Sequence, residues 1–265
     1  MTRLARRERL PVTALILALV AIGFFVLPLA GLLWRAPWSD VVGNLSEPLV
    51  RQAIWLSLVI SVASTALALV FGVPLAWLYA RVEFRAKRYL RIVTLMPMVL
   101  PPVVGGVALL LAFGRRGVIG QYLDRWFDLS LAFSTTGAIL AATFVAMPLL
   151  VITVESGFRT VDKRYEEAAR TLGANRWMVF RRVTLPLLRP SLLAGTALCW
   201  ARALGEFGAT ITFAGNLPGE TQTLPLAVYL NLQGAGLETA LTLSLVLLGV
   251  SAVVLVGFRD RWLGQ

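Results

Sequence analysis

The sequence predicts an all-α membrane protein with six transmembrane helices, and three observations carry that prediction. Hydrophobic residues make up 58% of the 265-residue chain, and the mean hydropathy is +0.77, whereas soluble domains contain about 45–50% apolar residues. Six apolar stretches are each close to the length of about 20 residues that a helix needs to cross the hydrocarbon core. The Lys and Arg residues lie almost entirely in the gaps between these stretches.

The predicted spans, in order, are residues 12–34, 53–79, 89–113, 136–154, 191–213 and 237–258. The first follows a basic amino-terminal segment, as a signal peptide does. Its apolar run is longer than the roughly 7–15 residues of a signal-peptide core, and no convincing small-residue cleavage site follows it. We therefore expect it to be an uncleaved first transmembrane helix.

The third predicted span contains Pro97, Pro101 and Pro102, followed by Gly105 and Gly106. Such a helix must kink or partly unwind, which a membrane tolerates where the freed backbone is buried in protein or lines a cavity. A purely structural kink and a pore-lining segment are equally compatible with this pattern.

The positive-inside rule predicts the orientation of the spans. Nineteen Lys and Arg residues fall on one side of the membrane: the amino-terminal segment with Arg3, Arg6, Arg7 and Arg9, the second–third gap, the fourth–fifth gap and the tail. Five fall on the other side, and Arg202 lies within a span. Both termini are therefore expected to face the cytoplasm. The chain then forms one membrane domain, residues 1–265, with its longest polar loop, residues 155–190, inside the cell.

The composition argues against several classes of function. The net charge of +11 would suit nucleic acid, but the positive-inside pattern accounts for it without such a partner. The chain has no His and one Cys, Cys199, so it holds no internal disulfide, and no Cys/His metal site is expected. No G-x-x-x-x-G-K-[ST] motif occurs, and neither Lys87 nor Lys163 follows a glycine. The chain therefore lacks the phosphate-binding loop of an ATPase and is not expected to be an enzyme.

The polar loop carries the pattern E-A-A-x3-G-x9-V-x-L-P, which runs from Glu167 to Pro186. Residues 164–172 are good helix formers, Gly173 suits a left-handed helix end, and Asn175 suits the cap of a second short helix. We expect Pro186 and Pro190 to stop this second helix before the fifth span. The two short helices would form a knob that fits a groove in a partner. The alternative is an amphipathic loop lying on the membrane surface.

This pattern, between two spans and on the positive side, resembles the coupling loop of type I ABC importer permeases. The resemblance implies six-span permease architecture and a loop, residues 164–186, that docks on a separate ATPase dimer, which binds the ATP so that this chain needs no cofactor. It also implies a solute-binding protein at the outer face, a pairing of two identical permease chains, and lipid around them. The coupling residues would be Glu166, Glu167, Ala168, Ala169, Gly173, Val183, Leu185 and Pro186.

Residues 201–229 read ARALGEFGATITFAGNLPGETQTLPLAVY. This stretch resembles the corresponding region of molybdate/tungstate permeases, and more distantly that of sulfate/thiosulfate permeases. The resemblance implies import of an oxyanion, with molybdate or tungstate favoured and sulfate or thiosulfate as the alternative. A membrane-embedded enzyme is a weaker alternative because the spans lack His and hold few ionisable groups. A scaffold without transport activity is a third.

Arg202 and Glu206 are the charged residues predicted to lie well inside a span, and a spacing of four places them on one helix face. They form either an oxyanion site or an internal ion pair that fixes packing, and the ion pair is favoured because tight binding in the pore would slow release. Gly205 and Gly208 would permit close helix approach, and Thr210 and Thr212 would bond across helices. The candidate translocation path comprises Arg202, Glu206, Gly205, Thr210, Pro101 and Pro102. Residues 223–232, in the outer gap, form either a short re-entrant or surface helix or a packed loop.

Overall fold

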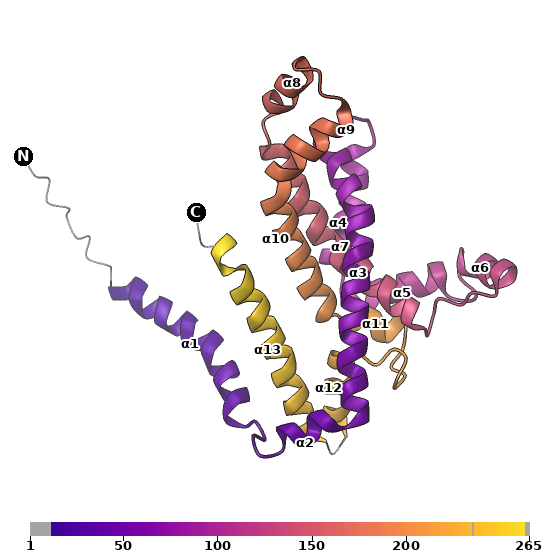
Figure 1. Cartoon of the computed structure of the whole chain (residues 1–265). Helices are drawn as coiled ribbons and strands as arrows, with labels where there is room; N and C mark the ends of the chain where they lie inside the picture. Colours follow the sequence, from indigo (N-terminus) through magenta and orange to yellow (C-terminus); the bar gives the residue numbers. More distant parts are fainter. Residues whose placement is uncertain (1–11, 235, 263–265) are drawn as a thin grey trace, which may run out of the picture.

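The computed structural model describes residues 12–234 and 236–262, and every regular element in these ranges is a helix (Figure 1). In chain order the elements are α1 (Val12–Trp34), α2 (Val41–Ser46), α3 (Pro48–Arg81), α4 (Lys87–Val99), α5 (Pro102–Phe113), α6 (Gly120–Phe127), α7 (Thr135–Thr160), α8 (Lys163–Thr171), α9 (Arg176–Val179), the π-helical segment η1 (Phe180–Thr184), α10 (Leu185–Leu204), α11 (Gly208–Phe213), α12 (Leu224–Gln233) and α13 (Leu237–Trp262). The all-α prediction is confirmed.

Five helices in the described part of the chain are long and apolar enough to cross a membrane: Val12–Trp34, Pro48–Arg81, Thr135–Thr160, Arg176–Leu204 and Leu237–Val254. A helix satisfies its own backbone hydrogen bonds, which an apolar segment in lipid requires. The third predicted span is instead two shorter helices, α4 and α5. The arginines of residues 1–11, on which the predicted orientation of the amino terminus depends, lie outside the described residues.

Two consecutive prolines break the third predicted span. A residue that precedes proline is driven out of the helical region of backbone space. Leu100 and Pro101 both precede a proline, and both are extended, with ψ angles of 140° and 132°. Pro102 then begins α5, at a helix position where the missing N–H costs nothing. Partial unwinding was expected here, and the structure places it at residues 100–101.

The expectation that Pro186 and Pro190 stop the second loop helix is wrong. Helix runs from Arg176 to Leu204, through α9, η1 and α10. In η1 the chain is wound more loosely, and the N–H of Leu185 bonds to the carbonyl of Phe180, five residues back. Pro186 lies at the start of α10, directly after this loosened turn, so its ring is accommodated without ending the helix. Prolines also lie inside α1, α3, α4 and α7.

The centre of the molecule is a packed group of three long helices, α3, α7 and α10 (Figure 1). Small side chains such as Ala68, Ala142 and Ala146 are fully buried between them, which allows close backbone approach. The hydroxyl of Ser64 on α3 donates to the carbonyl of Ile139 on α7, at 3.0 Å. We call these three closely packed helices the frame. The α8–α9 loop connects α7 to α10 at one end of the frame, and α4 and α11 pack against α7.

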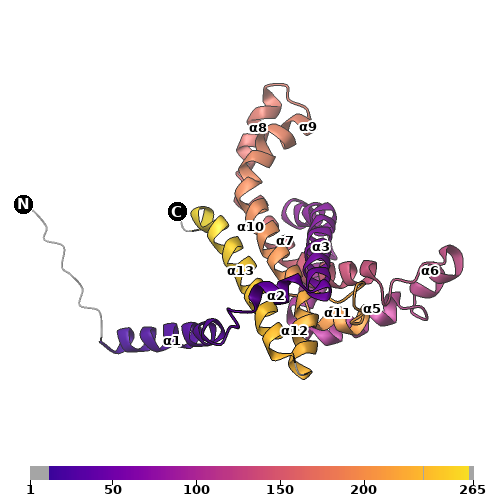
Figure 2. The same ribbon diagram turned by 60° about the horizontal axis from the view of Figure 1, so that its bottom comes forward.

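Helix α1 stands away from this frame in both views (Figures 1 and 2). None of its residues is buried, and it contacts α13 only weakly. The α8–α9 loop lies at the end of the molecule opposite α2 and α12 (Figure 1). The segment between the fifth and sixth predicted spans contains a short helix, α12, in which Leu224 and Leu226 are buried, so the alternative of a packed loop is wrong there.

Candidate functional site

Three local signals shape the loop between α7 and α10. The Asp162 side chain accepts from the N–H of Arg164 and starts α8, while that of Asn175 accepts from Met178 at 2.8 Å and starts α9. Gly173 has a φ of +86°, where side chains strain the backbone. The N–H groups of Gly173 and Ala174 bond to the carbonyls of Arg170 and Ala169, which closes α8. The first short helix, the glycine break and the Asn175 cap are therefore present as predicted, whereas the second helix starts as predicted but continues into α10.

Glu166 faces inward, unlike the residues beside it. Its Oε1 accepts from Nη2 of Arg81 at 3.1 Å and from the hydroxyl of Thr184 at 3.0 Å. Arg81 is the last residue of α3, and Thr184 is the last residue of η1. Glu166 thus ties α8 to the helical frame at two points, and the structure places it as a positioning residue rather than as part of an outer contact face.

The outer face of the loop carries other residues of the motif. Glu167 and Ala168 are exposed, as are Gly173 and Pro186, whereas Ala169, Val183 and Leu185 are half-buried. Trp177 is 67% exposed and stacks on Phe180, with ring centroids 5.9 Å apart. An exposed carboxylate beside a small alanine offers both a charged contact and room for a partner surface. That this face docks on an ATPase stays a prediction.

A second region forms where the two broken helices meet. The break between α4 and α5 faces the break between α10 and α11. At Gly106 and Gly208 the two segments touch without a side chain of these residues between them. A Cβ on Gly208 would lie 2.7 Å from the Cβ of Pro102, and one on Gly106 would lie 2.8 Å from the carbonyl oxygen of Ala209. Only glycine permits these contacts, so Pro102 is brought against the beginning of α11, the helix in which Thr210 is buried.

Arg202 and Glu206 form the expected ion pair. Nη1 of Arg202 lies 2.7 Å from Oε2 of Glu206, whose side chain is 2% exposed. The other carboxylate oxygen, Oε1, accepts from the N–H of Ala209 at 2.8 Å, in the first turn of α11. α10 ends at Leu204, so Glu206 lies in the break itself and holds the two helix pieces together. This geometry suits the structural interpretation of the pair.

Two finer expectations about this region are wrong. The hydroxyl of Thr212 bonds to the carbonyl of Gly208 within α11, at 2.8 Å, and not across helices. A hydroxyl in an apolar helix commonly bonds back one turn, because the carbonyl there is already within reach. Gly205 is not a close-approach site either, since a Cβ there would meet only the carbonyl of Ala201, at 3.6 Å. Gly205 ends α10 instead.

Glu155 is a buried charged residue that the sequence analysis missed. The fourth span was predicted to end one residue earlier, but α7 continues to Thr160. The Glu155 side chain is 2% exposed and pairs with Arg91 on α4, at 3.2 Å, and with Arg159, at 2.7 Å. The spacing of four between Glu155 and Arg159 is the signal that could have found it. The pair with Arg91 holds the short helix α4 against the frame.

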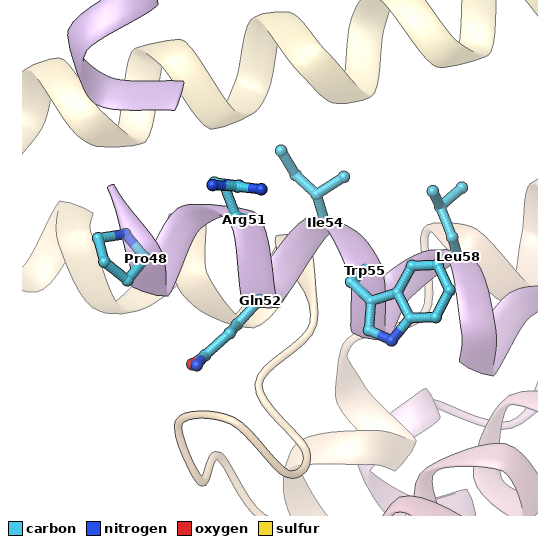
Figure 3. A pocket seen from close by; sticks show the side chains of 6 residues that line it. All are labelled: Pro48, Arg51, Gln52, Ile54, Trp55 and Leu58. Carbon is cyan, nitrogen blue, oxygen red and sulfur yellow. The ribbon is translucent and has the colours of Figure 1, made fainter. Parts of the chain in front are cut away.

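A groove of about 600 Å³ follows the beginning of α3. It is lined by Pro48, Arg51, Gln52, Ile54, Trp55 and Leu58. Figure 3 shows Arg51 and Gln52 pointing to opposite sides of the helix. Recognition of a small polar ligand needs polar groups that converge. We therefore assign no binding role to this groove.

Comparison with known proteins identifies the family to which this architecture belongs. The family model described as binding-protein-dependent transport system inner membrane component matches residues 68–265. The chain belongs to this family. The match begins inside α3 and includes α7, the α8–α9 loop and the α4–α5 and α10–α11 breaks. It therefore covers both regions described above.

Similar members of the family carry transport names. The molybdenum transport system permease protein ModB of Mycobacterium tuberculosis is 46% identical over 244 residues, covering 92% of each chain. That of Escherichia coli is 45% identical over 214 residues, 81% of this chain and 93% of the relative. The sulfate transport system permease protein CysW of Synechococcus elongatus is 37% identical over 254 residues, 94% of this chain and 88% of the relative.

Solved structures support the fold. A chain of the bacterial alginate ABC transporter in complex with alginate pentasaccharide-bound periplasmic protein has a TM-score of 0.75 at 17% identity. The alignment covers 95% of this chain and 93% of that one. The architecture predicted for the family, that of an ABC importer permease, is therefore confirmed at the level of the fold.

Proposed function

We propose that this chain is the membrane-spanning subunit of an ATP-driven importer for molybdate or tungstate. The observation that supports the substrate class is the identity of 45–46% to the molybdenum permeases of Mycobacterium tuberculosis and Escherichia coli, against 37% to the sulfate permease. Sulfate or thiosulfate is the second candidate, because that relative also aligns along most of its length.

The energy for transport comes from a separate ATPase dimer, because the sequence contains no phosphate-binding loop. The face formed by Glu167 and Ala168 docks on the ATPase. Glu166 supports that face from behind, through Arg81 and Thr184. ATP binding brings two ATPases together and moves the docked loops with them, so the ligand biases a two-state membrane element.

The transport pathway is gated where the two broken helices meet. Backbone that is not helical is tolerated at membrane depth where it is enclosed by protein or lines a cavity. The α4–α5 and α10–α11 breaks supply such backbone, and the contacts at Gly106 and Gly208 close it in the present conformation. Arg202 and Glu206 fix the geometry of the second break and do not hold the oxyanion.

Two copies of the chain form the pathway, with a solute-binding protein at the outer face. The three closely packed helices of one frame leave little room for a pathway between them, and α1 and α6 extend away from the frame (Figure 1). The cytoplasmic placement of both termini and of the α8–α9 loop follows from the distribution of Lys and Arg.

The test is ATP-dependent uptake of labelled molybdate by proteoliposomes that contain this chain with its neighbouring ATPase and a solute-binding protein. Excess tungstate should abolish uptake, and excess sulfate should leave it unchanged. Inhibition by sulfate instead would move the chain to the sulfate and thiosulfate permeases. No uptake of either oxyanion, with an intact complex, would overturn the proposed function.

A further inference from the structure

A cavity of about 350 Å³ lies between the α8–α9 loop and the helical frame. Its lining comes from α3, α7, α8, α9 and η1: Val73, Pro74, Trp77, Phe158, Glu166, Arg170, Arg176, Val179, Phe180 and Thr184. This volume is within the range of ligand sites in proteins. The cavity lies behind the loop, on the side where Glu166 points, and not on the outer face that carries Glu167.

The charged end of this cavity is positive. Glu166 is already bound by Arg81 and Thr184. Arg170 and Arg176 flank the Gly173 turn, both are exposed, and neither forms an ion pair within the part of the chain that the structure describes. The carboxylate that lines the cavity, Glu166, is held by Arg81 and Thr184, so the guanidinium groups of Arg170 and Arg176 favour an anionic group such as a phosphate.

The other end of the cavity is apolar and continues onto the surface of α3. Val73, Pro74 and the fully buried Phe158 form it. Val70, Pro74 and Trp77 share one face of α3, because they are spaced by four and three residues, and all three are exposed. Trp77 is 45% exposed, and tryptophan favours the boundary between lipid and water.

We propose that this cavity binds an anionic phospholipid of the cytoplasmic leaflet. The phosphate lies between Arg170 and Arg176, and one acyl chain follows Pro74 and Val70 into the membrane. Basic pockets on the cytoplasmic side of membrane helices commonly bind such headgroups, and the apolar floor favours a lipid over a free anion. The inference rests on the proposed cytoplasmic placement of the loop. The bound lipid would fix the angle between α8 and α9, and so prepare the loop for docking.

The experiment is native mass spectrometry of the purified chain taken from membranes that contain phosphatidylglycerol and phosphatidylcholine. The unmodified chain should retain phosphatidylglycerol preferentially. The double variant Arg170→Gln/Arg176→Gln should lower the apparent affinity for phosphatidylglycerol about thirtyfold, because each basic residue contributes roughly fivefold near an anionic surface. Retention of phosphatidylcholine should not change.

The matched control is Arg181→Gln, an exposed arginine of the same helix that does not line the cavity. It should retain phosphatidylglycerol as the unmodified chain does, and all variants should unfold at the same temperature. Equal retention by the double variant, or displacement of the lipid by millimolar inorganic phosphate, would overturn the proposal. Neither measurement requires ATPase or molybdate, so a failure here is distinct from a failure of the proposed transport function.

Discussion

Arg81 and Glu166 are 85 residues apart in the sequence and joined by an ion pair of 3.1 Å at the base of the α8–α9 loop. Their side chains are only 10% and 17% exposed. The neighbouring Glu167 is exposed and has no such contact among the described residues. Two adjacent glutamates therefore have opposite surroundings. We expect Glu166 to contribute to the stability of the loop and Glu167 to its docking.

Glu166→Ala should destabilise the chain by about 1–3 kcal/mol, because it leaves Arg81 and Thr184 without their shared acceptor. Glu167→Ala should change stability by less than about 0.5 kcal/mol, since it removes no internal contact. Thermal unfolding of the purified variants in one detergent measures both. Equal losses for the two variants would contradict the positions that we describe.

Glu167→Lys should insert and fold normally and yet bind the ATPase weakly. The substitution reverses the charge of an exposed side chain, and rim charges affect partner binding more than folding. Co-purification with the ATPase, together with ATP turnover in proteoliposomes, provides the measurement. Full association and full transport by this variant would exclude the docking role of the loop face.

Gly106→Ala should cost about 1–3 kcal/mol of stability, the usual effect of overfilling a packed contact. The added Cβ would lie 2.6 Å from the Cβ of Thr212 and 2.8 Å from the Ala209 carbonyl oxygen, so α5 and α11 must separate. Gly23→Ala in α1 is the control, because nothing lies within 4 Å of its new Cβ. Unfolding temperatures that fall equally for both variants would refute the close contact of the two broken helices.

Glu206→Gln and Glu206→Ala distinguish the two interpretations of the Arg202 pair. Gln keeps an acceptor for the Ala209 N–H, whereas Ala removes both contacts and leaves Arg202 without its partner, at a cost of about 3–5 kcal/mol. If the pair is structural, uptake should follow stability across the two variants. A Gln variant with full stability and a large rise in the KM for molybdate would instead indicate that the charge of Glu206 helps pass the oxyanion.

Glu155→Gln should cost about 1–3 kcal/mol, because it weakens the contacts to Arg91 and Arg159, whose side chains are 39% and 50% exposed. Glu83→Gln is the comparison, since Glu83 is exposed and its one ion pair among the described residues is with Lys87, at 2.6 Å. The hydrogen bond and charge of Lys87 hold the pKa of Glu83 below its ordinary value. Its small contribution to stability is therefore present above the ordinary carboxylate pKa and is lost as the pH falls. Chemical unfolding at neutral and acidic pH checks both effects.

The membrane helices and the motif of the loop could be read from the sequence, because apolar length and local caps determine them. The caps at Asn175 and Gly173 depend only on neighbouring residues, and both formed as expected. Whether each proline breaks or only bends its helix could not be predicted in the same way. Leu100 and Pro101 unwind because each precedes a proline, whereas Pro186 is accommodated by the loosened turn of η1.

The sequence alone also could not predict which side chains of the loop point inward. Glu166 and Glu167 are identical side chains in the same short helix, and only the position of Arg81, at the end of a distant helix, determines which of them turns inward. The buried Glu155 likewise pairs with Arg91, which lies far earlier in the chain, on α4. Contacts between residues far apart in the chain decide such details, and local spacing does not encode them.

The continuous helix from Arg176 to Leu204 connects the two regions described above, the α8–α9 loop and the α10–α11 break. Its 29 residues extend for about 40 Å, at a rise of 1.5 Å per residue. One end lies directly after the Gly173 turn, and the other ends at Gly205, beside the gap closed by Glu206. A continuous helix transmits a displacement from one end to the other, and we expect it to bend most easily at the π-helical turn η1. We therefore expect a movement of the Gly173 end to reach Gly205, where the next helix, α11, packs against α5.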